Sequence, residues 1–184
     1  MERSESLDLS PRLPTIPKHM VVLGIDPGLS TTGYAIVESR GNATQAIAVG
    51  VIRTDRSRPI AERLVELHRD IAEIVAEYQP HEAAIEQVFV NRNLQTATAV
   101  GRASGVILLS LAQAAIPIEE YTPSAVKMAL CGYGNADKTQ VGRVVQMRLG
   151  LPGVPGPADA ADALAIALCH LQSAPMRRAV ERVT

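Results

Sequence analysis

The stretch at residues 20–37 places the strongest constraint on how this chain folds. Residues 20–25 form an apolar run of the length expected for a buried strand. The run ends at residues 26–28, Asp-Pro-Gly, where the proline cannot donate to a sheet and the glycine tolerates turn geometry. The apolar residues 33–37 then predict a returning strand, and hence a hairpin with Asp26 at the end of its first strand.

Asp26 has two interpretations at this point. A carboxylate at the end of a buried strand is costly unless it is paired or bound to a metal ion, which favours a functional site. An aspartate that caps the turn by accepting hydrogen bonds from backbone amides is equally consistent with this stretch. The choice between the two depends on the rest of the chain.

The composition limits the class of protein. A chain of 184 residues with 47% hydrophobic residues has enough apolar material for one domain of ordinary size. No apolar run reaches the ~18 residues that span a membrane, and the N-terminus has no apolar signal segment. Cys131 and Cys169 lie far apart without a CxxC pair, which indicates a reducing compartment without disulfides or a zinc site. We therefore expect a cytoplasmic protein without a membrane segment.

The remaining pattern predicts one folded domain. Residues 1–19 are expected to be a disordered N-terminal tail, 20–174 the domain, and 175–184 a short C-terminal tail. Further strands are predicted at 43–53, 82–87 and 117–121, and helices at 59–78, 94–116, 123–130, 137–149 and 158 to about 173. Three antiparallel strands, then two parallel strands, with flanking helices resemble the ribonuclease-H-like fold, an α/β architecture with a mixed five-stranded sheet.

Two of the predicted helices have informative surfaces. In helix 59–78 the apolar residues recur at spacings of three and four, and the charged residues, Arg63 among them, are assigned to the solvated face. In helix 94–116, Ala97, Gly101 and Gly105 fall four residues apart. Because glycine lowers helix stability, this spacing predicts close backbone contact with the sheet or with a second copy of the chain.

Acidic residues recur where the predicted elements end or begin. The strand at 82–87 carries Glu86, so two parallel strands deliver Asp26 and Glu86 to the edge where α/β sheets bind ligands. Asp159 and Asp162 lie three residues apart and hence on one side of the last predicted helix. Asp159 also fits a capping role near the positive end of the helix dipole. That role does not account for Asp162, which has apolar neighbours.

These four acids together predict an all-oxygen site, which suits Mg²⁺ or Mn²⁺ better than zinc. Two such ions can activate a water and stabilise the leaving oxygen of a phosphodiester. The chain carries 18 basic and 19 acidic residues, a net charge of −1 that is unusual for a nucleic-acid binder. Without the four acids, 18 basic residues face 15 acidic ones, which leaves a net charge of +3.

Five segments in order resemble the RuvC family of bacterial Holliday-junction resolvases, from about Val21 to His170: LGIDPGLSTTGYAIV, AAIEQVF, PSAVK, GNADK and ADAADALAIALCH. The resemblance implies a homodimeric endonuclease with two Mg²⁺ or Mn²⁺ ions per active site. It implies paired cuts in four-way DNA junctions that leave 5′-phosphate and 3′-hydroxyl ends. It further implies work in recombination and DNA repair beside the branch-migration helicase complex of RuvA and RuvB.

The resemblance also assigns roles to single residues. It implies that Asp26, Glu86, Asp159 and Asp162 are the catalytic, metal-binding acids, and that Lys127 and Lys138 contact phosphate and stabilise charge in the transition state. Phe89 would stack on a splayed base. Arg92 and Arg102 are candidates for contact with backbone phosphates on other grounds, because arginine suits bidentate phosphate recognition. Each residue also has a plainer reading: solvated surface lysines and arginines, and a phenylalanine in the core. His170 lies two turns beyond Asp162, a position that fits a place at the site, a packed histidine or a solvent-facing one.

Three rival functions share features with this sequence. Actin-like ATPases and sugar kinases open with a similar Gly-Ile-Asp-x-Gly hairpin, but they need two duplicated halves and this chain has room for one. A non-catalytic junction-binding protein would not need four acids at strand ends and a helix start. Another ribonuclease-H-like nuclease, acting on RNA or simple duplex, is disfavoured only by the match along the whole chain.

Overall fold

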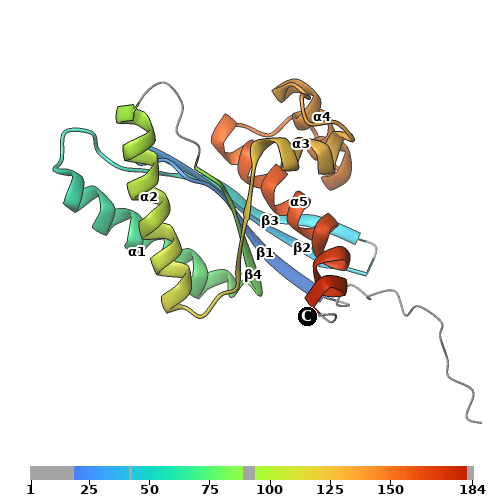
Figure 1. Cartoon of the computed structure of the whole chain (residues 1–184), viewed down its shortest axis with the longest axis horizontal. Helices are drawn as coiled ribbons and strands as arrows, with labels where there is room; N and C mark the ends of the chain where they lie inside the picture. Colours follow the sequence, from blue (N-terminus) through green and yellow to red (C-terminus); the bar gives the residue numbers. More distant parts are fainter. Residues whose placement is uncertain (1–18, 42, 89–93, 182–184) are drawn as a thin grey trace, which may run out of the picture.

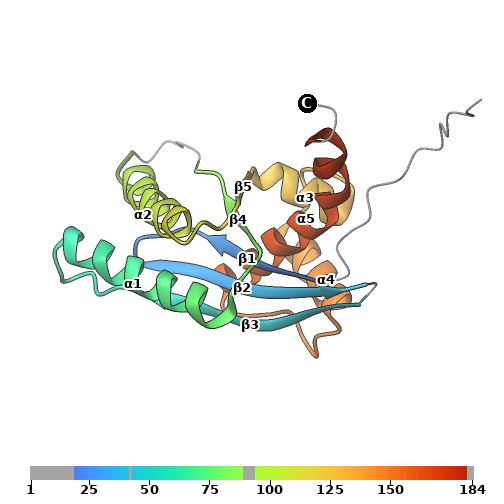
Figure 2. The ribbon, with the colours of Figure 1, turned by 90° about the horizontal axis from the view of Figure 1, so that it is seen from below.

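A five-stranded mixed sheet forms the centre of the molecule, in a computed structural model that describes residues 19–41, 43–88 and 94–181. Its strand order is β3-β2-β1-β4-β5 (Figures 1 and 2). The strands β1 (His19–Asp26), β2 (Thr31–Arg40) and β3 (Ala43–Arg53) are antiparallel. The strands β4 (Glu82–Glu86) and β5 (Ile118–Tyr121) run parallel to β1. The predicted sheet is confirmed.

Helices cover both faces of this sheet (Figures 1 and 2). Helices α1 (Ile60–Tyr78) and α2 (Leu94–Gln113) pack on one face, and α3 (Pro123–Cys131), α4 (Lys138–Leu149) and α5 (Ala158–Glu181) on the other. Because side chains alternate along a strand, β1 divides its residues between two cores. Leu23 and Ile25 pack toward α1 and α2, whereas Val22 and Gly24 face α5.

Local capping sets where the helices near the α5 face begin. The Thr122 side chain accepts a hydrogen bond from the Ala125 amide at the start of α3. Asp137 and Gln140 form a capping box at the start of α4. The capping box makes Lys138 the first residue of α4, next to α5.

The last helix is longer than predicted. It continues to Glu181 rather than ending near residue 173, so residues 175–181, expected as tail, are helical. Arg177 anchors this extension to the sheet: it donates hydrogen bonds to the Tyr121 hydroxyl and to Glu82, the latter at 3.1 Å. These contacts join positions more than 50 residues apart, which a local pattern does not reveal.

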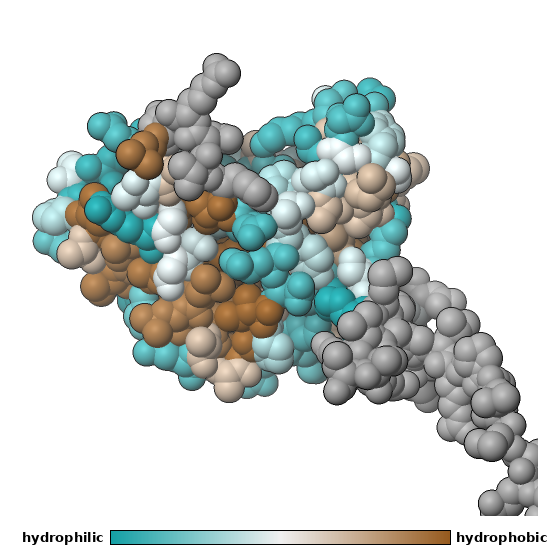
Figure 3. Space-filling view, viewed as in Figure 1, coloured by the Kyte–Doolittle hydropathy of each residue, from teal (hydrophilic) through white to brown (hydrophobic). Residues whose placement is uncertain are grey.

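Helix α2 exposes an apolar face. Gly101 and Gly105 are solvent-exposed, and a Cβ at either would meet no atom within 4 Å, so the predicted glycine contact with the sheet is wrong. The opposite face of α2, with Ala103 and Ile107, is buried against the sheet and α1. By length and composition alone α2 could cross a membrane, a criterion that a packed helix of a soluble domain also meets. Figure 3 shows hydrophobic surface gathered on the α1–α2 side of the molecule.

Candidate active site

Asp26 and Glu86 end neighbouring strands. Ile25 pairs with Ile85 in the parallel β1–β4 register, so the next residue of each strand lies beside the other at the same edge. Gly24 and Ala84 face α5. Asp26 and Glu86 each lie two residues further along the same strands, so they face α5 as well. The predicted meeting of these two acids is therefore seen in the structure.

Two glycines bring the start of α5 onto this edge. A Cβ at Gly33, the β2 partner of Asp26, would overlap the backbone carbonyl of Asp159. A Cβ at Gly24 would overlap the carbonyl of Ala163. The absence of side chains at both positions allows the α5 backbone to lie directly on β1 and β2. The first turns of α5 thus carry Asp159 and Asp162 to Asp26.

The electrostatics of the four carboxyl groups reflect this crowding. The pKa of Asp26 is raised from 3.8 to about 8, mainly by burial and, to a smaller extent, by the nearby charges of Glu86, Asp162 and Asp159. Burial also raises the pKa of Glu86, while a hydrogen bond with Asp26 acts in the opposite direction. Neighbouring carboxyl groups repel one another when all are ionised, and a bound cation stabilises their ionised forms. The all-oxygen donor set fits a hard divalent ion such as Mg²⁺.

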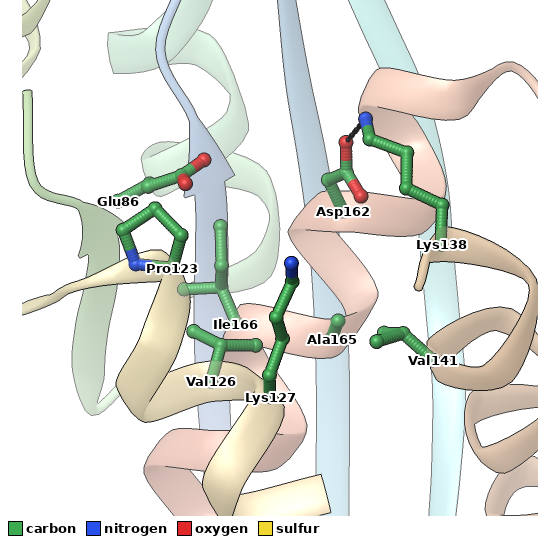
Figure 4. Close-up of a pocket in the computed structure, with 9 residues that line it drawn as sticks. All are labelled: Glu86, Pro123, Val126, Lys127, Lys138, Val141, Asp162, Ala165 and Ile166. Carbon is green, nitrogen blue, oxygen red and sulfur yellow. Dashed lines mark hydrogen bonds and ion pairs between the residues drawn. The ribbon is translucent and has the colours of Figure 1, made fainter. Parts of the chain in front are cut away.

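Lysines supply the positive charge at this edge. The Lys138 ammonium lies 2.7 Å from Asp162 Oδ2, and this hydrogen bond raises the pKa of Lys138. Lys127 projects from α3 toward the same space, a pocket of about 180 Å³ (Figure 4). Its lining residues are Glu86, Pro123, Val126, Lys127, Lys138, Val141, Asp162, Ala165 and Ile166.

Among the described residues, no three acidic, histidine or cysteine side chains converge into a closed metal cluster. In this arrangement Lys138 is the close partner of Asp162.

Comparison with known proteins identifies the family. The family model for the crossover junction endodeoxyribonuclease RuvC matches residues 22–170, most of the chain. The chain belongs to the RuvC family. A RuvC from Chloroflexus aggregans is 49% identical over 85% of this chain and 95% of its own length. A RuvC from Desulfitobacterium hafniense is 47% identical over 84% and 93%, respectively.

Solved RuvC structures share this fold. Thermus thermophilus RuvC, in complex with a Holliday junction substrate, superposes with a TM-score of 0.82 at 37% identity, covering 86% of this chain and 96% of its own. The yeast mitochondrial Holliday junction resolvase Ydc2 reaches a TM-score of 0.62 at 15% identity over 94% and 87% of the two chains, which supports the fold alone. The ribonuclease-H-like α/β fold is therefore confirmed.

The RuvC fold brings six predicted site residues to one edge: Asp26, Glu86, Asp159, Asp162, Lys127 and Lys138. Arg102 is exposed on α2 and does not line the pocket of Figure 4. Phe89 and Arg92 lie outside the described residues. His170 is buried between the Tyr121 hydroxyl and Glu82, at 3.0 and 2.6 Å, so it packs in the core and does not line that pocket.

Sequence reasoning missed Arg63. It is buried, not on the solvated face of α1, which corrects the earlier assignment. Its guanidinium donates to Thr54 Oγ1 at 2.9 Å, Ser30 Oγ at 3.0 Å and the Leu29 carbonyl at 3.2 Å. Arg63 thereby holds the turn that follows Asp26. The spacing of Arg63 could have indicated its burial, because Arg63 lies four residues before the buried Leu67 and hence on the same face of α1.

Proposed function

We propose that this chain resolves Holliday junctions as a crossover junction endodeoxyribonuclease, by metal-dependent phosphodiester hydrolysis in homologous recombination and DNA repair. The observation that carries the proposal is the meeting of four carboxyl groups from β1, β4 and α5 at one sheet edge, beside two lysines, in a chain of the RuvC family. The Thermus thermophilus homologue, in complex with a Holliday junction, supports the substrate.

Asp26, Glu86, Asp159 and Asp162 would hold the metal, which we propose to be two Mg²⁺ ions, with Mn²⁺ as a substitute. When bound, such ions supply water activation and stabilisation of the leaving oxygen. The chain fixes the carboxyl groups on two rigid strands and one helix start. Because the pKa of Asp26 is raised to about 8, its carboxyl must lose a proton before it can act as a ligand at neutral pH.

Lys127 and Lys138 are proposed to contact the scissile phosphate and offset its developing charge. Both line the pocket that Glu86 and Asp162 also line (Figure 4). Lys138 can turn from Asp162 to a phosphate because its side chain is 76% exposed. Hydrolysis at this site is proposed to leave a 5′-phosphate and a 3′-hydroxyl, so that the cut ends can be religated.

A homodimer is the proposed working form. The exposed face of α2 carries Leu94, Gly101, Gly105 and Leu109 at spacings of four or seven residues, and hence on one side of the helix. Leu94 and Leu109 are 69% and 55% exposed, and the glycines between them allow close approach of a second α2. A two-fold axis would place two equivalent sites on two strands of a four-way junction.

The proposed setting is the bacterial cytoplasm, where the enzyme would work beside the branch-migration helicase complex of RuvA and RuvB. The family supports this assignment, and so do Cys131 and Cys169, which are free thiols, as expected in a reducing compartment. Phe89, Arg92 and Arg102 are proposed as further DNA contacts, by stacking and by phosphate recognition.

The test is cleavage of a synthetic four-way junction and of a linear duplex with the same arm sequence, with and without Mg²⁺. We expect symmetric, religatable nicks in the junction alone and only with metal. Equal cutting of both substrates would indicate a different ribonuclease-H-like nuclease. Binding without cutting, in Mg²⁺ and in Mn²⁺, would indicate a non-catalytic junction-binding protein.

A further inference from the structure

An exposed arginine ends the edge strand β3 on the side of the active site. Thr31 pairs with Arg53 and Gly33 with Val51, while Gly33 pairs on its other side with Asp26. Arg53 therefore lies two strands across and two residues along from Asp26. With strands about 4.8 Å apart and about 3.4 Å per residue, their Cα atoms are about 12 Å apart.

Arg53 also faces the same way as the catalytic acids. Directly paired residues of antiparallel strands point to the same face, so Asp26, Gly33 and Val51 share a face, and Arg53, two residues beyond Val51, shares it too. That face is the α5 side, because Gly33 lies against Asp159.

The position of Arg53 is fixed relative to Asp26. The next residue, Thr54, is buried, and its backbone amide donates to the Ser30 carbonyl at 3.3 Å. Its hydroxyl donates to the Leu29 carbonyl and accepts from Arg63. The end of β3 and the turn after Asp26 are thus tied together by one buried set of hydrogen bonds.

The positive charge of Arg53 is not used within the described part of the chain. Arg58, five residues later, pairs with Glu62 and Glu66. Arg53 and Arg56 are exposed, and neither has an ion pair with a described residue. The intervening Asp55 accepts a hydrogen bond from the Ser57 amide at 2.9 Å, which holds its carboxylate within the turn.

We propose that Arg53, assisted by Arg56, binds backbone phosphates of the DNA strand that enters the active site, on the β3 side of the scissile phosphate. Arginine suits this role because its planar guanidinium can form two hydrogen bonds to one phosphate. The inference rests on the proposed function for its substrate. It extends the DNA-binding surface along the sheet edge to β3, the outer strand farthest from β4 and β5.

The test is the salt dependence of junction and duplex binding, measured by fluorescence anisotropy without metal for the wild type and for Arg53→Gln, Arg53→Lys and Arg53→Gln/Arg56→Gln. The logarithm of the binding constant falls with the logarithm of the salt concentration, and each lost phosphate contact makes this slope shallower by about 0.9. Arg40→Gln is the matched control, since Arg40 is exposed at the opposite end of β2. Unfolding temperatures of all variants verify their folding.

We expect the slope to fall by about 0.9 in Arg53→Gln and by up to twice that in the double variant. Arg53→Lys and Arg40→Gln should retain the wild-type slope. An unchanged slope in folded Arg53→Gln, or a wild type that binds no DNA, would overturn the inference. If the wild type binds junction and duplex equally, the proposed function is contradicted. A shallower salt dependence of binding in Arg53→Gln would in that case still support the phosphate contact.

Discussion

Gly33 of β2 lies so close to Asp159 of α5 that a Cβ at Gly33 would overlap the Asp159 carbonyl oxygen. This contact determines how near α5 approaches Asp26, the β1 partner of Gly33. The distance between the strand acids and the helix acids therefore depends on a residue that has no side chain.

Replacement of Gly33 by alanine should displace the start of α5. We expect Gly33→Ala to lower the free energy of unfolding by about 1–3 kcal/mol, as overpacking does, and to lower junction cleavage more than junction binding. Thermal unfolding and single-turnover cleavage are the measurements. Gly153→Ala is the control, because a Cβ at Gly153 meets no atom within 4 Å. Equal effects of the two substitutions would contradict this role of Gly33.

The raised pKa of Asp26 predicts how stability depends on pH without metal. The folded protein holds the Asp26 proton up to about pH 8, whereas the unfolded chain releases it near 3.8. The folded state therefore loses stability as the pH rises from about 4 to about 8. We expect Asp26→Asn to flatten this decline and to raise the melting temperature at pH 8 by about 2–4 °C for each kcal/mol recovered. A steeper decline in the variant would refute this assignment.

The ion pair between Lys138 and Asp162 should compete with metal binding. An exposed pair is worth about 0.2–1 kcal/mol, so we expect Lys138→Gln to raise the Mg²⁺ affinity of the DNA-free protein by up to about fivefold. Calorimetric titration measures this, and junction cleavage should nevertheless fall. Arg143→Gln is the comparison, since Arg143 is exposed on α4 but does not line the pocket of Figure 4. Weaker Mg²⁺ binding in Lys138→Gln would contradict the competition.

The exposed face of α2 predicts how the proposed dimer is disrupted. Leu109→Glu places a charge on this face and should convert the proposed dimer to a monomer in sedimentation analysis. Met147→Glu is the matched control, because Met147 is 76% exposed on α4. The dimer proposal predicts that Leu109→Glu cuts one strand of a junction without the paired second cut. A wild-type monomer, or a dimeric Leu109→Glu, would count against this surface.

The sequence predicted the parts of the site that depend on short-range patterns. The apolar runs before Asp26 and Glu86, and the three-residue spacing of Asp159 and Asp162, are local. Parallel pairing of the two strands then follows from their connection through a helix. The approach of α5 to the sheet was not predicted, because it depends on glycines more than 120 residues earlier in the chain.

Buried polar contacts were the other part that sequence reasoning missed. Arg63 was assigned to the solvated face, whereas it donates a hydrogen bond to the distant Leu29 carbonyl. A packed position was among the readings for His170, but its partner Glu82 was not predicted. From the sequence alone, a charged residue in a helix is assigned to the solvent-facing side, because its buried hydrogen-bond partners lie elsewhere in the chain. The length of α5 was underestimated for the same reason, since Arg177 finds its partners on β4 and β5.

The central claim is that four acids from three elements act as one metal-dependent cleavage site. The most direct test is Mg²⁺-dependent cleavage of a four-way junction by Asp26→Asn, Glu86→Gln, Asp159→Asn and Asp162→Asn, each beside its junction affinity. Glu73→Gln is the control, since Glu73 is 71% exposed on α1. We predict that each of the four variants loses about 100-fold or more in cleavage rate and still binds the junction, while Glu73→Gln cuts like the wild type. Near-normal cleavage by any one of the four would contradict the claim.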